Sequence, residues 1–94
     1  MIEKKYSKKY YEIEAEIRRQ SLNVIRFINE QKELNNKETV INFVLMDFRF
    51  ISVNSVNLIR YARDNSLITY DESIRLYEYT DEQIRIIYDE LQKL

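Results

Sequence analysis

The sequence contains no glycine, proline, cysteine, histidine or tryptophan. Without cysteine the chain can form no disulfide and no thiolate metal site, and without histidine it lacks the commonest ligand of zinc and copper sites. Without glycine it has no ordinary phosphate-binding loop and none of the usual hairpin turns. Because these absences exclude most of the residue combinations that are used in catalysis, we expect a protein that is not an enzyme and that uses no cofactor and no metal.

Long apolar runs are also missing. Four lysines near the start of the chain (Lys4, Lys5, Lys8 and Lys9) are not followed by the apolar core of a signal peptide. No segment approaches the roughly 20 apolar residues that a membrane span requires. With 94 residues, of which 45% are hydrophobic, the chain is expected to form one helical domain over residues 1–94. We expect this domain to be soluble and cytoplasmic, with no membrane contact.

The spacing of apolar residues predicts an all-α fold, a compact bundle of four to five helices with a long N-terminal helix. Ser7 is the expected cap of the first helix, which runs to about Leu34 and carries an apolar stripe at helical spacing. The members of this stripe are Tyr6, Tyr10, Ile13, Ile17, Val24 and Ile28. Such a helix is about 40 Å long, which is more than a globule of this size needs. The stripe therefore either packs inside the bundle or joins two chains in a homodimer through the first helix.

The second helix is expected over residues 37–51, the most apolar part of the chain, with Asn35 as its cap. A break is predicted at Ser52–Ser55, because an unbroken helix would scatter polar side chains over every face. A third helix over residues 55–66 then ends at Asn65–Ser66.

Two capping boxes are predicted in the last third of the chain. Thr69 with Glu72 has this pattern and begins a short fourth helix. Thr80 with Gln83 repeats the pattern and begins a last helix over residues 81–94. Since no glycine is available for helix C-caps, helix ends have to come from asparagine and from the cap of the next helix.

Asp47 interrupts the apolar arc of the expected second helix. Burial without a partner would be strongly unfavourable, so this carboxylate needs a partner or an opening to solvent. Three interpretations remain open: an ion pair with an arginine of a facing helix, an oligomer or ligand interface, and a carboxylate tuned for chemistry. Glu12 and Glu16 share a helix face at a spacing that divalent-metal sites use, but which more often marks a solvated face.

Acidic side chains gather in the C-terminal third, and tyrosines are abundant throughout. Residues 69–94 carry seven acidic and three basic side chains, and the chain has eight tyrosines in all. Tyrosine is enriched at binding hot spots, and an acidic surface suits a basic partner. The predicted partner-binding residues are Tyr79, Glu78, Asp81, Glu82, Asp89, Tyr10 and Tyr11. Such a surface resembles those that occupy a basic or nucleic-acid-binding site of a target protein, although each tyrosine also fits the edge of a core.

Residues 37–66 offer an alternative, a helix-turn-helix that binds DNA. Asparagine reads adenine and arginine reads guanine or phosphate, and both residue types are present on the expected recognition helix. The alternative DNA-binding residues are Asn54, Ser55, Asn57, Arg60 and Arg63. Against this interpretation, the turn has no glycine, the preceding helix is almost wholly apolar and the net charge is −1.

The ending YTDEQIRIIYDEL, after an amphipathic first helix, resembles the small helical antitoxins of the epsilon type, and residues 56–76 resemble helical bacteriocin-immunity proteins. Both resemblances rest on common helix residues, so they assign no family and no site. The abundance of isoleucine, asparagine and lysine is typical of A/T-rich coding genomes and suggests a bacterial mobile element. The sequence predicts a small non-enzymatic binding or regulatory protein that inhibits or neutralises a protein partner, of the antitoxin, immunity or phage anti-defence type. A small helix-turn-helix transcriptional regulator is the alternative.

Overall fold

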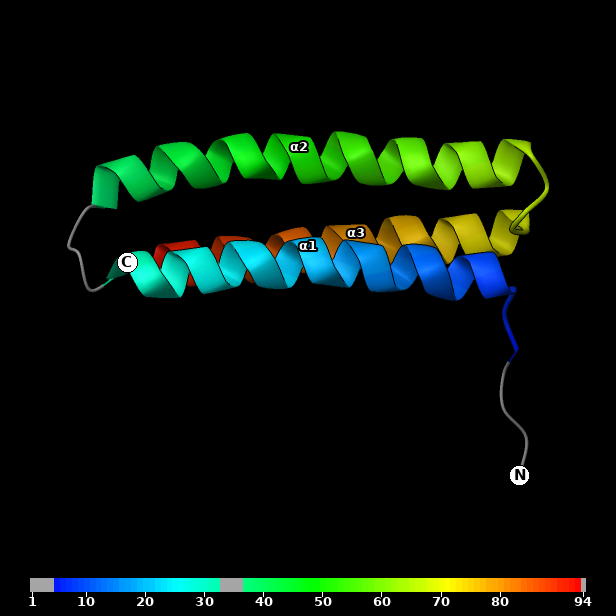
Figure 1. Cartoon of the computed structure of the whole chain (residues 1–94), viewed down its shortest axis with the longest axis horizontal. Coiled ribbons are helices and arrows are strands. Elements are labelled where there is room, and N and C mark those ends of the chain that lie inside the picture. Colours follow the sequence, from blue (N-terminus) through cyan, green and yellow to red (C-terminus); the bar gives the residue numbers. More distant parts are fainter. Residues whose placement is uncertain (1–4, 33–36, 94) are drawn as a thin grey trace, which may run out of the picture.

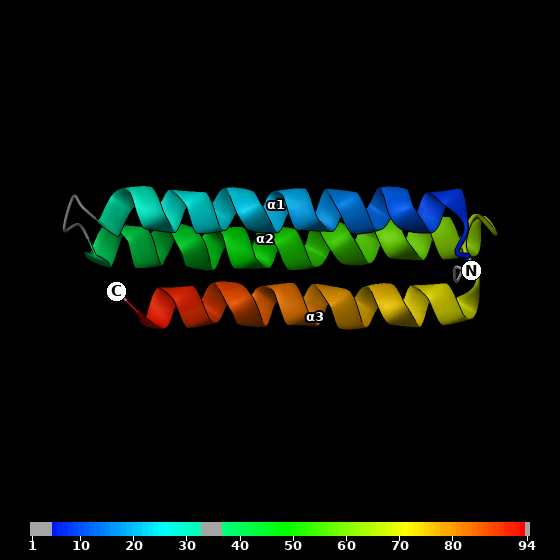
Figure 2. The same cartoon turned by 90° about the horizontal axis from the view of Figure 1, so that it is seen from below.

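The computed structural model describes residues 5–32 and 37–93, apart from the side chains of Lys37, Thr39, Asp47, Phe48 and Phe50. The side chain of Asp47, for which three interpretations were left open, therefore lies outside the described residues. Three helices fill the described part: α1 (Lys8–Lys32), α2 (Lys37–Asp64) and α3 (Tyr70–Gln92). They lie side by side, and α2 runs antiparallel to α1 and α3 (Figures 1 and 2). No strand occurs in the described ranges, so the all-α class is confirmed, but the helices number three rather than four or five.

The predicted break at Ser52–Ser55 was wrong, because α2 continues through it. Neither glycine nor proline is present to stop the helix, and an unbroken α2 buries one continuous face. Among the buried residues of that face are Ile51, Ile59 and Ala62. Ser55 is fully buried on it, whereas Asn42 and Asn57 are exposed. The free energy gained by burying this apolar face exceeds the cost of enclosing the one hydroxyl of Ser55. The other two polar residues, Asn42 and Asn57, lie toward solvent and do not oppose a continuous helix.

The predicted break at Thr80 was wrong for a different reason. Thr80 is buried inside α3, where its Oγ1 donates a 2.8 Å hydrogen bond to the backbone oxygen of Leu76, one turn earlier. This bond satisfies the hydroxyl within the helix, so a threonine that matched an N-cap pattern serves instead as an interior residue.

Two predicted helix starts are confirmed. The backbone N of Tyr10 donates to Ser7 Oγ at 3.3 Å, which caps α1. At the start of α3, the Glu72 N donates to Thr69 Oγ1 at 3.0 Å, and the Thr69 N donates to Glu72 Oε1 at 2.9 Å. These two bonds complete a capping box. The cap predicted at Asn35 lies outside the described residues.

The end of α2 uses a serine where a glycine is usual. The Leu67 N donates to the Ala62 oxygen at 2.8 Å, and the Ser66 N donates to the Arg63 oxygen at 3.0 Å. This pair of bonds is the Schellman motif, which requires a left-handed residue, and Ser66 has φ 60°. The side chain of Asn65 adds a 2.8 Å bond to another carbonyl of the last turn, so the predicted end at Asn65–Ser66 is confirmed.

Replacing Ser66 with glycine is expected to raise the free energy of unfolding by about 1 kcal/mol, because glycine adopts a positive φ without a clash of Cβ. Urea denaturation followed by circular dichroism measures the change. Ser66→Ala is the matched control, since alanine keeps the Cβ and should give no increase. A glycine variant that is no more stable than the alanine variant would contradict the prediction.

The core consists of two apolar clusters arranged along the bundle. The first lies toward the start of α1 and contains Tyr10, Ile13, Ile17, Ile59, Ala62, Ile68 and Leu76. The second lies toward its end and contains Val24, Ile28, Val40, Val44, Ile51 and Ile87. On each helix, one buried hydroxyl residue falls between the two clusters: Ser21 on α1, Ser55 on α2 and Thr80 on α3. We call these three residues the polar layer.

The apolar stripe of α1 packs inside the bundle. Its buried members, which lie in the two core clusters, are Tyr10, Ile13, Ile17, Val24 and Ile28. The three helices contain 25, 28 and 23 residues, so α1 is not long compared with its neighbours. These side chains are therefore not available for a homodimer through the first helix. Across residues 5–32 and 37–93, none of the helices combines the length and the apolar character that a membrane crossing requires.

Candidate partner-binding surface

An open hollow lies along the edge where α3 meets α1. Its volume is about 440 Å³. Its lining residues are Tyr10, Arg75, Glu78, Tyr79, Asp81, Glu82 and Arg85. Five of the seven predicted partner-binding residues are among them, so the fold brings most of this set together. A second hollow shares Arg75 and Glu78 with the first, which extends the same surface toward the start of α3. We call the first of these the α1–α3 hollow.

Tyr79 is held in place at one side of the hollow by α1. Arg18 Nε donates a 3.1 Å hydrogen bond to the Tyr79 hydroxyl, and this bond raises the pKa of Arg18. The same guanidinium lies 5.9 Å from the centre of the Tyr79 ring and 3.4 Å from Glu14. An aromatic side chain fixed before binding loses less conformational entropy when a partner arrives. Tyr79 is therefore suited to be an anchor.

Tyr10 has a different role from the one predicted. It is only 6% exposed and belongs to the first core cluster, so it lines the hollow from below. Its ring centre lies 4.3 Å from that of Tyr6 and 5.4 Å from that of Tyr11. Burial raises the pKa of the Tyr10 hydroxyl. Tyr11 is exposed beside this aromatic group and is not among the lining residues of the hollow.

The predicted acidic residues share one exposed side of α3. Glu78, Glu82 and Asp89 follow one another at helical spacing, and Asp81 lies beside them in the hollow. In the part of the chain that the structure describes, none of these four carboxylates forms an ion pair. Arg75 instead lies 5.4 Å from the ring centre of Tyr6. The acidic groups are thus available to a basic partner.

The residues predicted to bind DNA all lie on α2, but they do not form a helix-turn-helix, because α2 has no turn over residues 52–55. Asn57 and Arg60 are exposed, and Asn54 and Arg63 are half-buried. Ser55 is fully enclosed in the core and cannot reach a ligand in this fold. DNA binding by the remaining residues stays a prediction.

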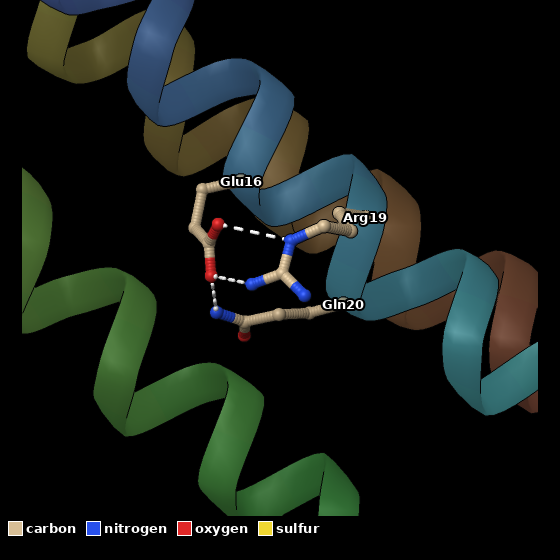
Figure 3. A network of polar contacts seen from close by, with 3 residues as sticks. All are labelled: Glu16, Arg19 and Gln20. Carbon is tan, nitrogen blue, oxygen red and sulfur yellow. Dashed lines mark hydrogen bonds and ion pairs between the residues drawn. The ribbon is translucent and has the colours of Figure 1, made fainter.

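The carboxylates of α1 that matched a metal-site spacing are engaged within their own helix. Figure 3 shows Glu16 between α1 and α2, where it accepts hydrogen bonds from Arg19 and Gln20. These bonds lower the pKa of Glu16. Glu12 pairs with Lys9 at 3.6 Å. Among the described residues, no group of three or more potential metal ligands gathers at one place.

Sequence reasoning missed a contact between the start of α1 and the start of α3. Glu72, identified from sequence only as a capping residue, also accepts bonds from the Ser7 N at 2.7 Å and from Ser7 Oγ at 2.9 Å. These bonds join the first turn of α3 to the cap of α1. A local pattern contains no sign of a partner 65 residues away. Only the parallel alignment of α1 and α3 brings the two starts together (Figure 1).

Comparison of the chain with protein-family models finds no match, and comparisons with curated proteins and with solved structures find none that is significant. The α1–α3 hollow and the charges around it are therefore the basis for a functional inference.

Proposed function

We propose that this chain is a non-enzymatic binding protein that inhibits or neutralises a macromolecular partner. The surface around the α1–α3 hollow covers a basic site of a protein partner and blocks that site's use. The observation that carries the proposal is a set of four exposed carboxylates on α3 beside the anchored ring of Tyr79, none of which has an ion-pair partner among the described residues. The expected type is an antitoxin, an immunity protein or a phage anti-defence protein.

Electrostatic complementarity supports a basic partner site. Free carboxylates increase the rate of encounter with a positive surface and disfavour partners of the same charge. The anchored tyrosine supplies apolar contact area and one hydroxyl beside these carboxylates, a combination found at binding hot spots. Arg75 and Arg85 in the same hollow give the surface a mixed pattern, which selects partners more narrowly than a uniformly acidic face would.

The test compares the wild-type chain with the double variant Glu78→Lys, Glu82→Lys. Both chains are immobilised and exposed to a lysate of a low-GC bacterium, captured proteins are identified by mass spectrometry, and purified candidates are titrated. We expect a partner whose affinity falls by about tenfold or more in the double variant, since each reversed contact removes about 1 kcal/mol or more.

Glu38→Lys is the matched control, because Glu38 is exposed on α2, away from the α1–α3 hollow. This control should bind the partner as the wild-type chain does, and circular dichroism should show all three chains equally folded. Equal capture by the double variant, or loss of capture in the control alone, would overturn the proposal. A wild-type chain that captures nothing beyond background would also overturn it.

A further inference from the structure

The hydroxyl of Tyr10, at the floor of the α1–α3 hollow, has no hydrogen-bond partner among the residues that the structure describes. The side chain is only 6% exposed. Within the described ranges, the polar side-chain atoms that are fully enclosed without a partner belong to Gln20, Ser21 and Ser55, so the Tyr10 hydroxyl is not one of them. The small exposed part of Tyr10 therefore includes its hydroxyl. Because a buried tyrosine hydroxyl usually has a partner, this one indicates a group that enters the hollow.

The charges around this hydroxyl place it between the two helices. The pKa of Tyr10 is raised by burial and by the charge of Glu14 on α1, and the charge of Arg75 on α3 opposes this shift. Arg75 also lines the hollow, so the hydroxyl lies on the side of the hollow. Its raised pKa keeps the hydroxyl protonated near neutral pH, and its oxygen is then able to accept a hydrogen bond.

The carboxylates of the hollow favour a cation as the group that enters. Glu78 and Glu82 lie one helical turn apart on α3, with Cβ atoms about 5–6 Å apart, so one cation can contact both. The lining also includes Arg75, but this guanidinium lies 5.4 Å from the ring centre of Tyr6 and forms no ion pair with Glu78 among the described residues. Glu78 and Glu82 are therefore accessible to a positive group from outside the chain.

The aromatic side chains at this edge distinguish between the two kinds of cation that proteins carry. Tyr79 already has a guanidinium of the chain itself, that of Arg18, 5.9 Å from its ring centre. A guanidinium is flat and weakly hydrated, so it stacks on an aromatic ring while its edge donates several hydrogen bonds. An ammonium is compact and strongly hydrated and has no flat face. A ring, two carboxylates and one accepting hydroxyl therefore suit arginine better than lysine.

We infer that the α1–α3 hollow binds the guanidinium group of an arginine side chain that a protein partner inserts. The inference rests on the proposed function and names the residue that the partner supplies. The edge of the guanidinium donates to Glu78 and Glu82 and, at the floor, to the hydroxyl of Tyr10. Its face lies on the ring of Tyr79, which the hydrogen bond from Arg18 holds in place.

The open shape of the hollow favours a side chain of a macromolecule over a free small molecule. Sites for small molecules are concave and cover most of the ligand's surface. The α1–α3 hollow is open along the edge of the bundle, so the surface of a partner has to cover the rest of the bound group. Arginine is also one of the residue types enriched at binding hot spots.

NMR titration tests the inference with two capped peptides of equal charge, alanine–arginine–alanine and alanine–lysine–alanine. The chain carries isotope-labelled tyrosine, so the ring signals of Tyr10 and Tyr79 report binding at the hollow. Tyr61 is exposed on α2, and its ring signals report contacts elsewhere. We expect the arginine peptide to shift the signals of Tyr10 and Tyr79 and to bind about fivefold or more tightly than the lysine peptide. Equal affinity of the two peptides would overturn the inference, as would the absence of a shift at the hollow.

Two variants test the contacts separately. Tyr10→Phe keeps the ring in the first core cluster and removes the hydroxyl, so the affinity for the arginine peptide should fall about threefold to tenfold. Tyr61→Phe is the matched control and should leave the affinity unchanged. Glu82→Gln should weaken the binding of both peptides, whereas Glu38→Gln on α2 should not. Circular dichroism shows whether the variants are folded. A folded Tyr10→Phe that binds the arginine peptide like the wild-type chain would contradict the assigned floor contact.

Failure of this inference differs from failure of the proposed function. A chain that captures no protein from the lysate but binds the arginine peptide at the hollow loses the proposed function and keeps the guanidinium site. A captured partner that binds Tyr10→Phe as tightly as the wild-type chain keeps the proposed function and overturns the inserted arginine.

Discussion

Replacing Glu72 with alanine is expected to lower the free energy of unfolding by about 3–4 kcal/mol. The Glu72 side chain joins three groups at one end of the bundle: the backbone N and the hydroxyl of Ser7, and the backbone N of Thr69. A hydrogen bond to a charged group contributes about 1.5–3 kcal/mol, and the three contributions overlap because they share one carboxylate. Glu72 is only 6% exposed, so water replaces these bonds incompletely when the carboxylate is removed.

Urea denaturation followed by circular dichroism measures this effect, and two variants show its origin. Glu72→Gln keeps one acceptor oxygen, so its stability should lie between those of the wild-type chain and Glu72→Ala. Asp71→Ala removes an exposed carboxylate from the same first turn of α3, where the helix dipole favours it by only about 0.3–1 kcal/mol. A loss below about 1 kcal/mol in Glu72→Ala would show that the link between α1 and α3 contributes little.

The contacts of Glu72 show which parts of this fold the sequence predicts. The capping box was recognised because its residues are three positions apart and each has a local partner. The bonds to Ser7 depend on the parallel alignment of α1 and α3, which follows from the number of helices. The predicted number of four to five helices was wrong, because the sequence pattern places helix starts at the polar residues 52–55 and at Thr80. In the structure Ser55 and Thr80 are interior residues.

The candidate site was predicted in part for the same reason. The acidic residues of α3 lie at helical spacing, so their common side is visible from local periodicity. The ion pairing of Arg18 with Glu14 is also local, but its hydrogen bond to Tyr79 connects two helices.

The polar layer leads to the second large expected effect. The double variant Ser21→Ala, Ser55→Ala should have a free energy of unfolding about 2 kcal/mol higher than that of the wild-type chain. Both hydroxyls are fully buried, and neither has a hydrogen-bond partner among the described residues. Folding removes each one from water without a compensating bond, whereas the methyl group of alanine fills the same space with no such penalty. Each single variant should show about half of the gain.

Thr80→Val is the matched control, because the third hydroxyl of the layer is already bonded to Leu76. Valine has nearly the same shape but cannot donate this bond, so we expect no gain in stability from it. Thermal and urea unfolding of the wild-type chain, the two single serine variants, the double variant and Thr80→Val separates the two cases. A double variant that is less stable than the wild-type chain would show that the two serines are bonded in the folded protein. If the gain is found, the two buried serines lower the stability of the bundle between its two core clusters.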